Sequence, residues 1–334
     1  MTDELRIGVI GTGGMGARHA ENIARHVVGA TISGVADPDT HRAAHVAEAV
    51  GATVYPSGDE LIASDSIDAV VIASPDDTHA HLAIACIEHS KPVLVEKPLA
   101  TRVEDALAVV RRQADEPSSL VQVGFMRRYD PGHLAVAVEL ADDIVGPPKL
   151  FRGWHRNPAS AVAPSSEDVL VQSAVHDFDS ARWLMGQEIE EVFVRGVKLH
   201  GNDSAGFELQ LISMRFDRGA IGVIEINRDS GCGYEVGVEV TGSQGVAATP
   251  PHHTATVRTV DRLQQRIEHD WLQRFADAYV GEVKAWVAGI HTQTMCGAGV
   301  WDGYVASATA LAGVRSLETQ QSVRLTLPDR PTAA

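Results

Sequence analysis

The residues at 93–98 place a carboxylate, a lysine and a proline directly after a short apolar run. The residue before a proline is pushed away from helical geometry, so we expect Lys97 to be extended at the carboxyl end of a strand. Ligands of open α/β sheets bind at that end. Lys97 is therefore either a solvated surface charge, as most lysines are, or a group that handles protons at a substrate.

A glycine-rich segment follows the first apolar run, Ile7–Ile10, and opens a helix-like stretch. Its pattern is G-x-G-x-x-G, in which Gly11 permits a tight turn and Gly13 lets backbone N–H groups approach a pyrophosphate. Gly16 permits close packing of helix and strand, and the N-terminus of the helix favours an anion. The pattern in this context predicts a dinucleotide site.

Asp37 ends the next apolar run and follows Gly16 by 21 residues. This is close to the spacing of about 20 residues typical of the acid that binds the ribose 2′-hydroxyl. A carboxylate accepts hydrogen bonds from ribose hydroxyls and repels a 2′-phosphate, and Pro38 stands where an NADP enzyme often has arginine or serine. We therefore predict NAD as the cofactor. The alternative reading of Asp37 is a helix N-cap.

The first third of the chain alternates apolar runs with helix-like stretches, which is typical of a parallel sheet covered on both faces. We expect strands at Leu5–Ile10, Thr31–Ala36, Ala69–Ala73, Val93–Glu96 and Leu120–Val123, and helices at Met15–Arg25, His41–Val50, His79–His89 and Val103–Ala114.

After Arg128 the pattern changes. Two helix-like stretches are followed by successive β-type runs without intervening helices, which indicates a mostly antiparallel, open sheet. We expect helices at Pro131–Leu140, Val169–Met185, Trp271–Ala288 and Asp302–Leu317, and strands at Glu191–Lys198, Phe207–Phe216, Ala220–Asn227 and Tyr234–Thr241. The predicted fold class is α/β. A Rossmann domain at 1–125 precedes an α+β domain at 126–334, whose last helices could pack back on the first domain.

Composition narrows the class of protein. A formal net charge of −16 argues against nucleic acid or an anionic membrane as the main partner. The three cysteines, Cys86, Cys232 and Cys296, are widely spaced, and no His/Cys cluster has ligand spacing, so we expect neither disulfides nor a metal site. The acidic N-terminus does not resemble a signal peptide, and we expect a cytoplasmic protein.

The stretch around His176 can be analysed as a helix. At 100° per residue, Gln172, His176, Asp179 and Trp183 lie within about 60° of one another. An amide four residues before the histidine, or a carboxylate three residues after it, could orient the imidazole ring. From these residues alone, His176 is either a structural histidine or a catalytic base.

Three motifs together resemble the glucose–fructose oxidoreductase / inositol dehydrogenase family: Gly11–Gly16, Ser74–His79 and Glu96–Pro98. The likeness covers nearly the whole chain, and Phe125–Asp130 with His155–Pro158 is most similar to the inositol dehydrogenase branch. The resemblance implies that NAD is bound by Gly11, Thr12, Gly13, Met15, Gly16, Asp37, Ser74, Pro75, His79, Glu96 and Lys97.

The family implies oxidation of a secondary alcohol on a polyol or sugar, with hydride passing to nicotinamide. By resemblance, Lys97 orients and polarises the hydroxyl, His176 is the base, and Glu96 lies against cofactor and lysine. The residues that would bind the substrate are Lys97, Arg127, His155, Asn157, Gln172, His176 and Tyr234.

The chain departs from the family at Gln172, where the family usually has an aspartate. Glutamine can orient an imidazole but cannot stabilise an imidazolium by charge. Either Asp179 takes over that electrostatic role, or His176 titrates lower and the substrate preference differs.

The resemblance predicts oxidation of myo-inositol to 2-keto-myo-inositol by a homotetramer that associates through the C-terminal sheet. Three alternatives stay open. The substrate could be another inositol isomer or an aldose, the enzyme could retain NAD and hydrolyse glycosides, or the protein could be a non-catalytic NAD-binding regulator.

Overall fold

A computed structural model describes residues 4–158, 165–198, 206–250, 254–295 and 297–331. The chain divides into two compact units. The first comprises Met1–Arg128, Asp277–Ser307 and Pro328–Ala334, and the second comprises Tyr129–Ala276 and Ala308–Leu327. The segment 277–307 thus belongs to the unit that contains the N-terminus.

The first unit is built on a six-stranded sheet in the order β3-β2-β1-β4-β5-β6. All five strand pairings in it are parallel. The strands are β1 (Leu5–Ile10), β2 (Ala30–Ala36), β3 (Thr53–Tyr55), β4 (Ala69–Ile72), β5 (Val93–Glu96) and β6 (Val121–Gly124). Strand order reverses between β1 and β4, so the carboxyl ends of these strands form the switch point at which such sheets bind ligands.

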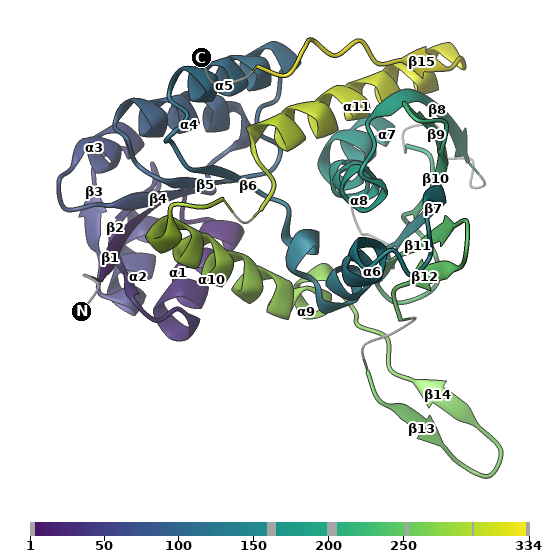
Figure 1. Ribbon diagram of the computed structural model, residues 1–334. Coiled ribbons are helices and arrows are strands. Elements are labelled where there is room, and N and C mark those ends of the chain that lie inside the picture. Colours follow the sequence, from purple (N-terminus) through teal and green to yellow (C-terminus); the bar gives the residue numbers. More distant parts are fainter. Residues whose placement is uncertain (1–3, 159–164, 199–205, 251–253, 296, 332–334) are drawn as a thin grey trace. The chain divides into compact units, whose positions relative to one another are not determined.

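Helices cover both faces of this sheet, as the continuous apolar strands require. Figure 1 shows α4 and α5 on one face, and α1, α2 and α10 on the other. Their bounds are α1 (Gly14–His26), α2 (Thr40–Val50), α3 (Gly58–Ala63), α4 (His79–Glu88), α5 (Val103–Asp115) and α10 (Ala276–Thr292), with 3₁₀ turns η1 (Asp76–Thr78) and η2 (Met126–Tyr129).

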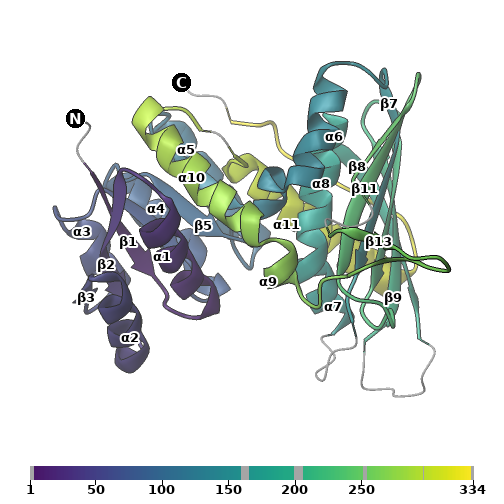
Figure 2. The ribbon, with the colours of Figure 1, turned by 90° about the horizontal axis from the view of Figure 1, so that it is seen from below.

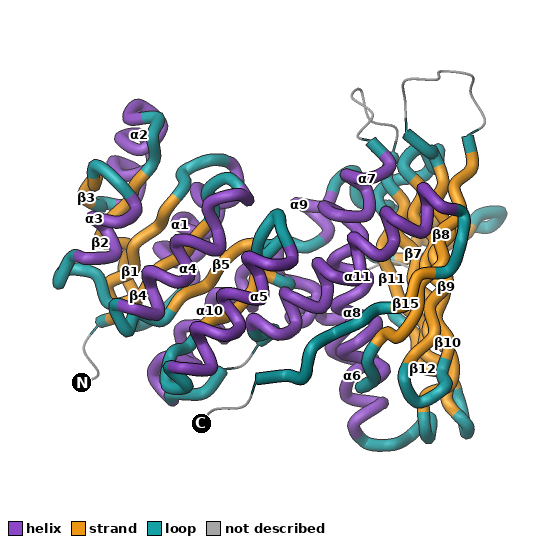
Figure 3. Tube along the Cα trace, turned by 90° about the horizontal axis from the view of Figure 1, so that it is seen from above, coloured by secondary structure: helices purple, strands orange, loops and turns teal. Residues whose placement is uncertain are grey.

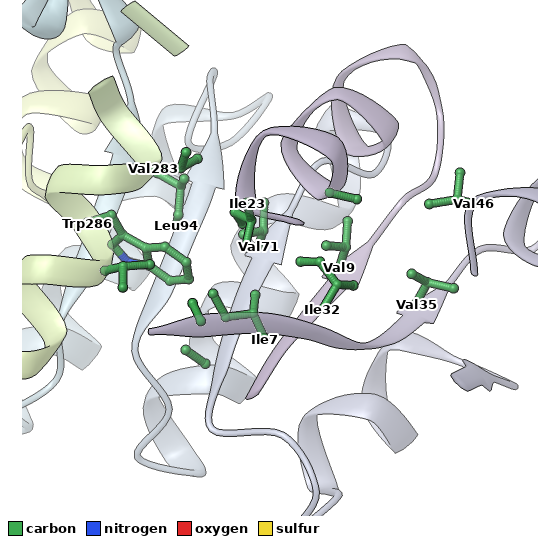
Figure 4. Close-up of a cluster of buried hydrophobic side chains, with 14 of the residues drawn as sticks. Ile7, Val9, Ile23, Ile32, Val35, Val46, Val71, Leu94, Val283 and Trp286 are labelled. Carbon is green, nitrogen blue, oxygen red and sulfur yellow. The ribbon is translucent and has the colours of Figure 1, made fainter. Parts of the chain in front are cut away.

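The core between the sheet and α10 includes residues from distant parts of the chain. Ile7 and Leu94 lie on strands, and Val283 and Trp286 pack against the same cluster from α10 (Figure 4). Burying these side chains stabilises the unit by roughly 1.5–3 kcal/mol for each large aliphatic or aromatic residue. The packing explains why residues 277–307 join the first unit.

The second unit contains a seven-stranded sheet in the order β12-β11-β7-β10-β9-β8-β15. Its pairings are antiparallel except for β7 with β10, which is parallel. The strands are β7 (Pro148–Arg156), β8 (Ile189–Val197), β9 (Leu209–Phe216), β10 (Ile221–Asn227), β11 (Glu235–Gly242), β12 (Val246–Ala248) and β15 (Val323–Arg324). A separate hairpin pairs β13 (Thr256–Arg258) with β14 (Leu263–Gln265).

Helices α6 and α8 lie on one face of the second sheet, as Figures 2 and 3 show from opposite sides. In the part of the chain that the structure describes, no helix covers its other face. The helices are α6 (Pro131–Ala141), α7 (Ser166–Asp168), α8 (Val175–Met185) and α9 (Trp271–Arg274), and α11 (Val300–Thr319) runs from the first unit into the second.

The fold class is confirmed, and three of the differences in detail concern longer elements of the chain. Strand β7 was not predicted, although it lies inside the second sheet, between β11 and β10. The expected helix at 271–288 is two helices, α9 and α10. The expected helix at 169–185 begins as a π-helix, η3 (Val169–Ala174), before α8. Among the described helices, none has the length and apolarity needed to cross a bilayer.

Candidate functional site

The glycine loop between β1 and α1 has the geometry expected of a phosphate cradle. Gly11 has φ +86°, and a Cβ there would lie 2.5 Å from the Ala73 oxygen and the Ser74 nitrogen. A Cβ on Gly16 would overlap the carbonyl oxygen of Gly11, whereas one on Gly13 would meet nothing within 4 Å. Two glycines thus serve chain packing, and Gly13 leaves open space where a ligand can approach the backbone.

Helix α1 presents an unblocked N-terminus to that space. Gly13 is its N-cap, with no side-chain cap, and the first turn carries no acidic residue. The first N–H groups of a helix have no partner within it and carry partial positive charge. The loop therefore fits the pyrophosphate of a dinucleotide. Thr12 is buried, and Met15 is partly buried in the first turn.

Asp37 lies at the carboxyl end of β2 and is tied to this loop. The Thr12 backbone N–H donates to its Oδ2 at 2.6 Å and the Asp39 N–H to its Oδ1 at 2.8 Å. Burial opposes ionisation, but hydrogen bonds from Arg42, Thr12 and Asp39 outweigh it and lower the pKa of Asp37 to about 2. Asp37 is thus a fixed carboxylate beside the glycine loop.

The structure does not support the interpretation of Asp37 as a helix N-cap. Asp39 caps α2 instead, because its side chain accepts from the N–H groups of His41 and Arg42. Asp37 remains available as the ribose acid, but it has a partner that sequence analysis missed. Arg42 Nη2 lies 2.8 Å from Asp37 Oδ1.

His79 connects the other two motifs of the first unit. Its Nδ1 lies 2.7 Å from the Pro98 carbonyl oxygen and its Nε2 2.9 Å from that of Ser74. The imidazole is buried and links the segment after β5 to the segment after β4. Its role in the structure is to position these loops, with Ser74 partly buried and Pro75 exposed on them.

Lys97 directly follows β5, at the carboxyl end of the strand, and is half-buried. The Lys97–Pro98 peptide bond is cis. Lys97 contacts its neighbour Glu96 through the backbone, since the Lys97 N–H donates to Glu96 Oε2 at 3.2 Å.

Glu96 is buried and accepts a second hydrogen bond from His19 Nε2 at 2.7 Å. Burial opposes ionisation of Glu96, yet His19, Lys97 and His79 outweigh that effect and hold its pKa below the usual range. Sequence analysis missed His19, which lies on the first turns of α1 without a motif of its own.

Sequence analysis also missed Glu282 on α10. One ligating atom each of His19, Glu96 and Glu282 lies within 4.8 Å of the others, and all three residues are buried. The search for ligand spacing in the sequence could not detect this cluster, because its members are separated by 77 residues or more.

In the second unit a buried network surrounds His155 on β7. Asp177 Oδ2 lies 3.1 Å from His155 Nδ1, and the Tyr234 hydroxyl lies 3.2 Å from His155 Nε2. Because a carboxylate only accepts, Nδ1 carries the proton and Nε2 accepts from the Tyr234 hydroxyl. Asp177 was not predicted, because on a helical wheel it is rotated by about 100° from His176 and lies off the face assigned to that residue.

His176 is on α8, next to Asp177, and is 8% exposed. Gln172 is exposed and lies in the π-helical turn, while Asp179 is fully buried. A π turn bonds i to i+5 rather than i+4, so a rotation of 100° per residue does not hold between Gln172 and His176. Such turns occur frequently at functional sites.

Two further predicted residues lie just after strands. Asn157 follows β7, and its backbone N–H donates to the Asn227 carbonyl oxygen at 2.7 Å. Arg127 lies in η2 after β6 and is 1% exposed. The structure thus gathers the cofactor candidates with Lys97 and Arg127 in the first unit, and His155, Asn157, His176 and Tyr234 in the second.

Comparison with known proteins identifies the family. Residues 5–125 match a model described as "Oxidoreductase family, NAD-binding Rossmann fold", and residues 133–248 match the GFO/IDH/MocA C-terminal domain. The chain belongs to the GFO/IDH/MocA oxidoreductase family. The predicted family and cofactor class, NAD, are thereby confirmed, and they agree with the open space at Gly13 and the carboxylate of Asp37.

Individual members of the family match over nearly the whole chain. An inositol 2-dehydrogenase of Rubrobacter xylanophilus is 46% identical, covering 99% of this chain and 96% of the relative. Inositol 2-dehydrogenase 3 of Saccharopolyspora erythraea is 38% identical, covering 98% of this chain and 97% of the relative. A crystal structure of myo-inositol dehydrogenase from Lactobacillus casei with NAD(H) and myo-inositol has a TM-score of 0.93 at 30% identity, with 98% of each chain covered.

Proposed function

We propose that this protein oxidises a ring hydroxyl of inositol to a ketone, with myo-inositol as the substrate and NAD as the hydride acceptor. The observation that carries the proposal is that similarity to inositol 2-dehydrogenases extends through both units. It therefore includes the second unit, which carries the buried polar network of His155, Asp177 and Tyr234.

Two residues would handle the hydroxyl proton. Lys97, at the end of β5, donates a hydrogen bond to the hydroxyl oxygen and polarises it, and His176 accepts the proton as general base. Bound NAD supplies the hydride acceptor for the carbinol carbon. Glu96 supports Lys97, because its carboxylate accepts from the Lys97 backbone N–H.

With glutamine rather than aspartate at position 172, orientation and electrostatic support of the His176 imidazole come from different residues. Gln172 is exposed in the π turn and can only orient the imidazole through its amide, whereas Asp179 is fully buried on α8. We assign orientation of His176 to Gln172 and its electrostatic support to Asp179. The remaining hydroxyl partners of the substrate are Arg127, Asn157 and Tyr234. His155, whose two ring nitrogens are engaged by Asp177 and Tyr234, orients the Tyr234 hydroxyl.

A polyol needs many such partners, because each buried polar group left unpaired costs about 1–3 kcal/mol. The network around His155 is suited to this task. Its tautomer is set by Asp177, so the Tyr234 hydroxyl has a defined donor direction. Orientation fixed in this way gives stereochemical selectivity among hydroxyls.

The test is a screen of the purified protein with NAD, inositol isomers and aldoses, with NADH absorbance as readout. Net NADH with myo-inositol, exceeding that with aldoses, is the expected result. A glycoside hydrolase returns its hydride in each cycle and accumulates no NADH, and a non-catalytic regulator produces none with any compound. NADH from aldoses alone would replace inositol with a sugar as substrate.

We further propose a homotetramer that associates through the open face of the second sheet. Paired residues on that face include Leu211 opposite Glu225 and Ser213 opposite Val223. Leu211 is 46% and Ile221 53% exposed, so the face combines apolar side chains with the ion pair of Arg156 and Glu225 at 2.8 Å. This mixture is typical of a protein interface.

We also propose a cytoplasmic location. Cys86 and Cys232 are both free thiols, one buried and one exposed. Free thiols are typical of proteins in a reducing compartment. Fractionation of cells that express the protein would test this proposal.

A further inference from the structure

Glu282 is a fully buried acid on the face of α10 that packs on the first sheet. It is 0% exposed, and neither carboxylate oxygen has a hydrogen-bond partner among the described residues. A buried ionised carboxylate without partners costs several kcal/mol. Glu282 therefore either carries a proton or shares a cation with its neighbours.

The neighbours are His19 on α1 and Glu96 at the end of β5. Ligating atoms of the three residues lie within 4.8 Å of one another, and His19 Nε2 is already bonded to Glu96 Oε1 at 2.7 Å. Two carboxylates this close in a dry interior do not both ionise. The cluster consequently holds one proton between its two carboxyl groups.

The surroundings assign that proton to Glu282. Burial first, and then the charge of Glu96, raise the pKa of Glu282 well above its usual value. Glu96 has the opposite shift, because His19, Lys97 and His79 favour its ionised form over the effect of burial. Glu96 also accepts from the Lys97 backbone N–H.

We propose that Glu282 is a positioning residue for the reaction, a neutral carboxylic acid that allows Glu96 to keep a single negative charge behind Lys97. This inference rests on the role proposed above for Lys97. Glu282 does not act on substrate or cofactor. It acts through Glu96, whose charge sets the electrostatic environment of the lysine at the end of β5.

The packing around the cluster keeps this arrangement fixed. A Cβ on Gly124 of β6 would lie 3.1 Å from Glu96 Oε2, so glycine leaves the space that the Glu96 side chain occupies. The ring of Tyr279, one turn before Glu282, meets the His19 ring edge to face at 6.1 Å. The titratable groups that face the cluster are His19 from α1, Lys97 after β5, His79 from α4 and Tyr279 from α10.

The first experiment detects the proton directly. Infrared difference spectra of the purified protein minus E282Q, both at pH 8, should contain the C=O band of one buried, protonated carboxylic acid. This measurement needs no turnover, so it is independent of the proposed function. Absence of the band overturns the inference, and so does one equivalent of bound metal in elemental analysis, since a cation would then replace the proton.

The second experiment measures the pH profile of kcat/KM for two variants. E282Q keeps a neutral, polar side chain of the same shape. We expect its kcat/KM to be within about twofold of the parent value, with both limbs of the pH profile unchanged. E282M keeps the volume but is apolar, so the charge of Glu96 loses a polar neighbour and Glu96 takes up a proton at higher pH than in the parent. We expect the acid limb of its pH profile to move to higher pH by about half a unit or more, with KM for NAD at pH 8 unchanged.

The outcomes separate this inference from the proposed function. A shifted profile for E282Q means that the charge of Glu282 is needed, and an unchanged profile for E282M means that Glu282 has no role in the reaction. Either result overturns the inference. Lys97→Ala tests the proposed role of the lysine by itself, because its loss of turnover does not depend on the state of Glu282.

Discussion

Arg42 and Asp37 form a two-point ion pair at the edge of the cofactor loop, with Nη2–Oδ1 at 2.8 Å and Nε–Oδ2 at 3.3 Å. Asp37 is buried, whereas the Arg42 side chain is 48% exposed. The acid that we expect to favour NAD therefore restrains an arginine that could bind a 2′-phosphate. The absence of an arginine at position 38 is therefore not enough to predict exclusion of NADP, because an arginine lies only five positions after Asp37.

We expect Asp37→Ser to weaken the binding of NAD and to allow NADP to bind. Loss of the carboxylate removes hydrogen bonds to ribose of about 1.5–3 kcal/mol, and KM for NAD should rise about tenfold or more. Arg42, released from its partner, can then pair with a 2′-phosphate. Steady-state kinetics with both cofactors measure the switch. The double variant D37S/R42A is the control, and NADP use as good as in D37S would show that Arg42 is not involved.

The same ion pair makes the free energy of unfolding depend on pH in the acid range. The pKa of Asp37 is lowered to about 2 in the folded state, against about 3.9 in an unfolded chain. The ionised Asp37 thus contributes to the free energy of unfolding above pH 4, and this contribution is lost as the pH falls towards 2. Discounted for the exposed arginine, it amounts to about 1–2 kcal/mol. Urea unfolding of the parent and Asp37→Asn should differ by that amount at pH 6 and converge near pH 2. A constant difference would contradict this assignment.

Tyr234→Phe tests the network in the second unit. The change removes the hydroxyl that donates to His155 Nε2 at 3.2 Å and should destabilise the protein by about 1 kcal/mol. If that hydroxyl also binds substrate, KM for inositol rises several-fold while KM for NAD stays the same. Tyr55→Phe is the matched control, since Tyr55 ends β3 in the first unit and its hydroxyl is bonded to that of Ser64. Equal effects of the two changes on KM would exclude Tyr234 from the substrate site.

The parallel sheet and its glycine loop were predictable because their signals are local. Continuous apolar runs, helix periodicity and G-x-G-x-x-G all lie within short windows of sequence, and β1 and β5 have the expected bounds. Strand β7 was missed because it begins at the second of two consecutive prolines and mixes charged with aromatic residues, as in Lys149-Leu150-Phe151-Arg152. Its partners β10 and β11 begin more than 60 residues later, so nothing near it in sequence indicates pairing.

The candidate site was predictable where a motif carries it, and it was not predictable where tertiary contacts create it. Gly13 and Asp37 belong to a spaced pattern, but His19 and Glu282 meet Glu96 through the packing of α1 and α10 against the sheet. The helical-wheel argument around Gln172 assumed a regular α-helix. The π turn at Val169–Ala174 breaks that regularity, and single-residue periodicity contains no signal for it.

The general base can be tested by His176→Ala. Removal of a positioned base reduces turnover by about 10²–10⁴-fold, whereas NAD binding should be unchanged because no cofactor motif includes this residue. Turnover from NADH absorbance, together with NADH fluorescence titration, separates the two effects. His89→Ala is the matched control, since His89 is an exposed histidine at the end of α4. Turnover of H176A equal to that of the control would contradict the assignment.

The open face of the second sheet should determine the oligomeric state. Leu211 is 46% exposed and lies opposite Glu225 on β10. Leu211→Glu would place two carboxylates side by side in the proposed interface. Like charges opposite each other destabilise a sheet face and an interface alike. Size-exclusion chromatography with light scattering should give a tetramer for the parent and smaller species for L211E. The control, Val28→Glu, alters a residue 97% exposed in the first unit and should leave the mass unchanged. A tetramer that persists in L211E would locate the interface elsewhere.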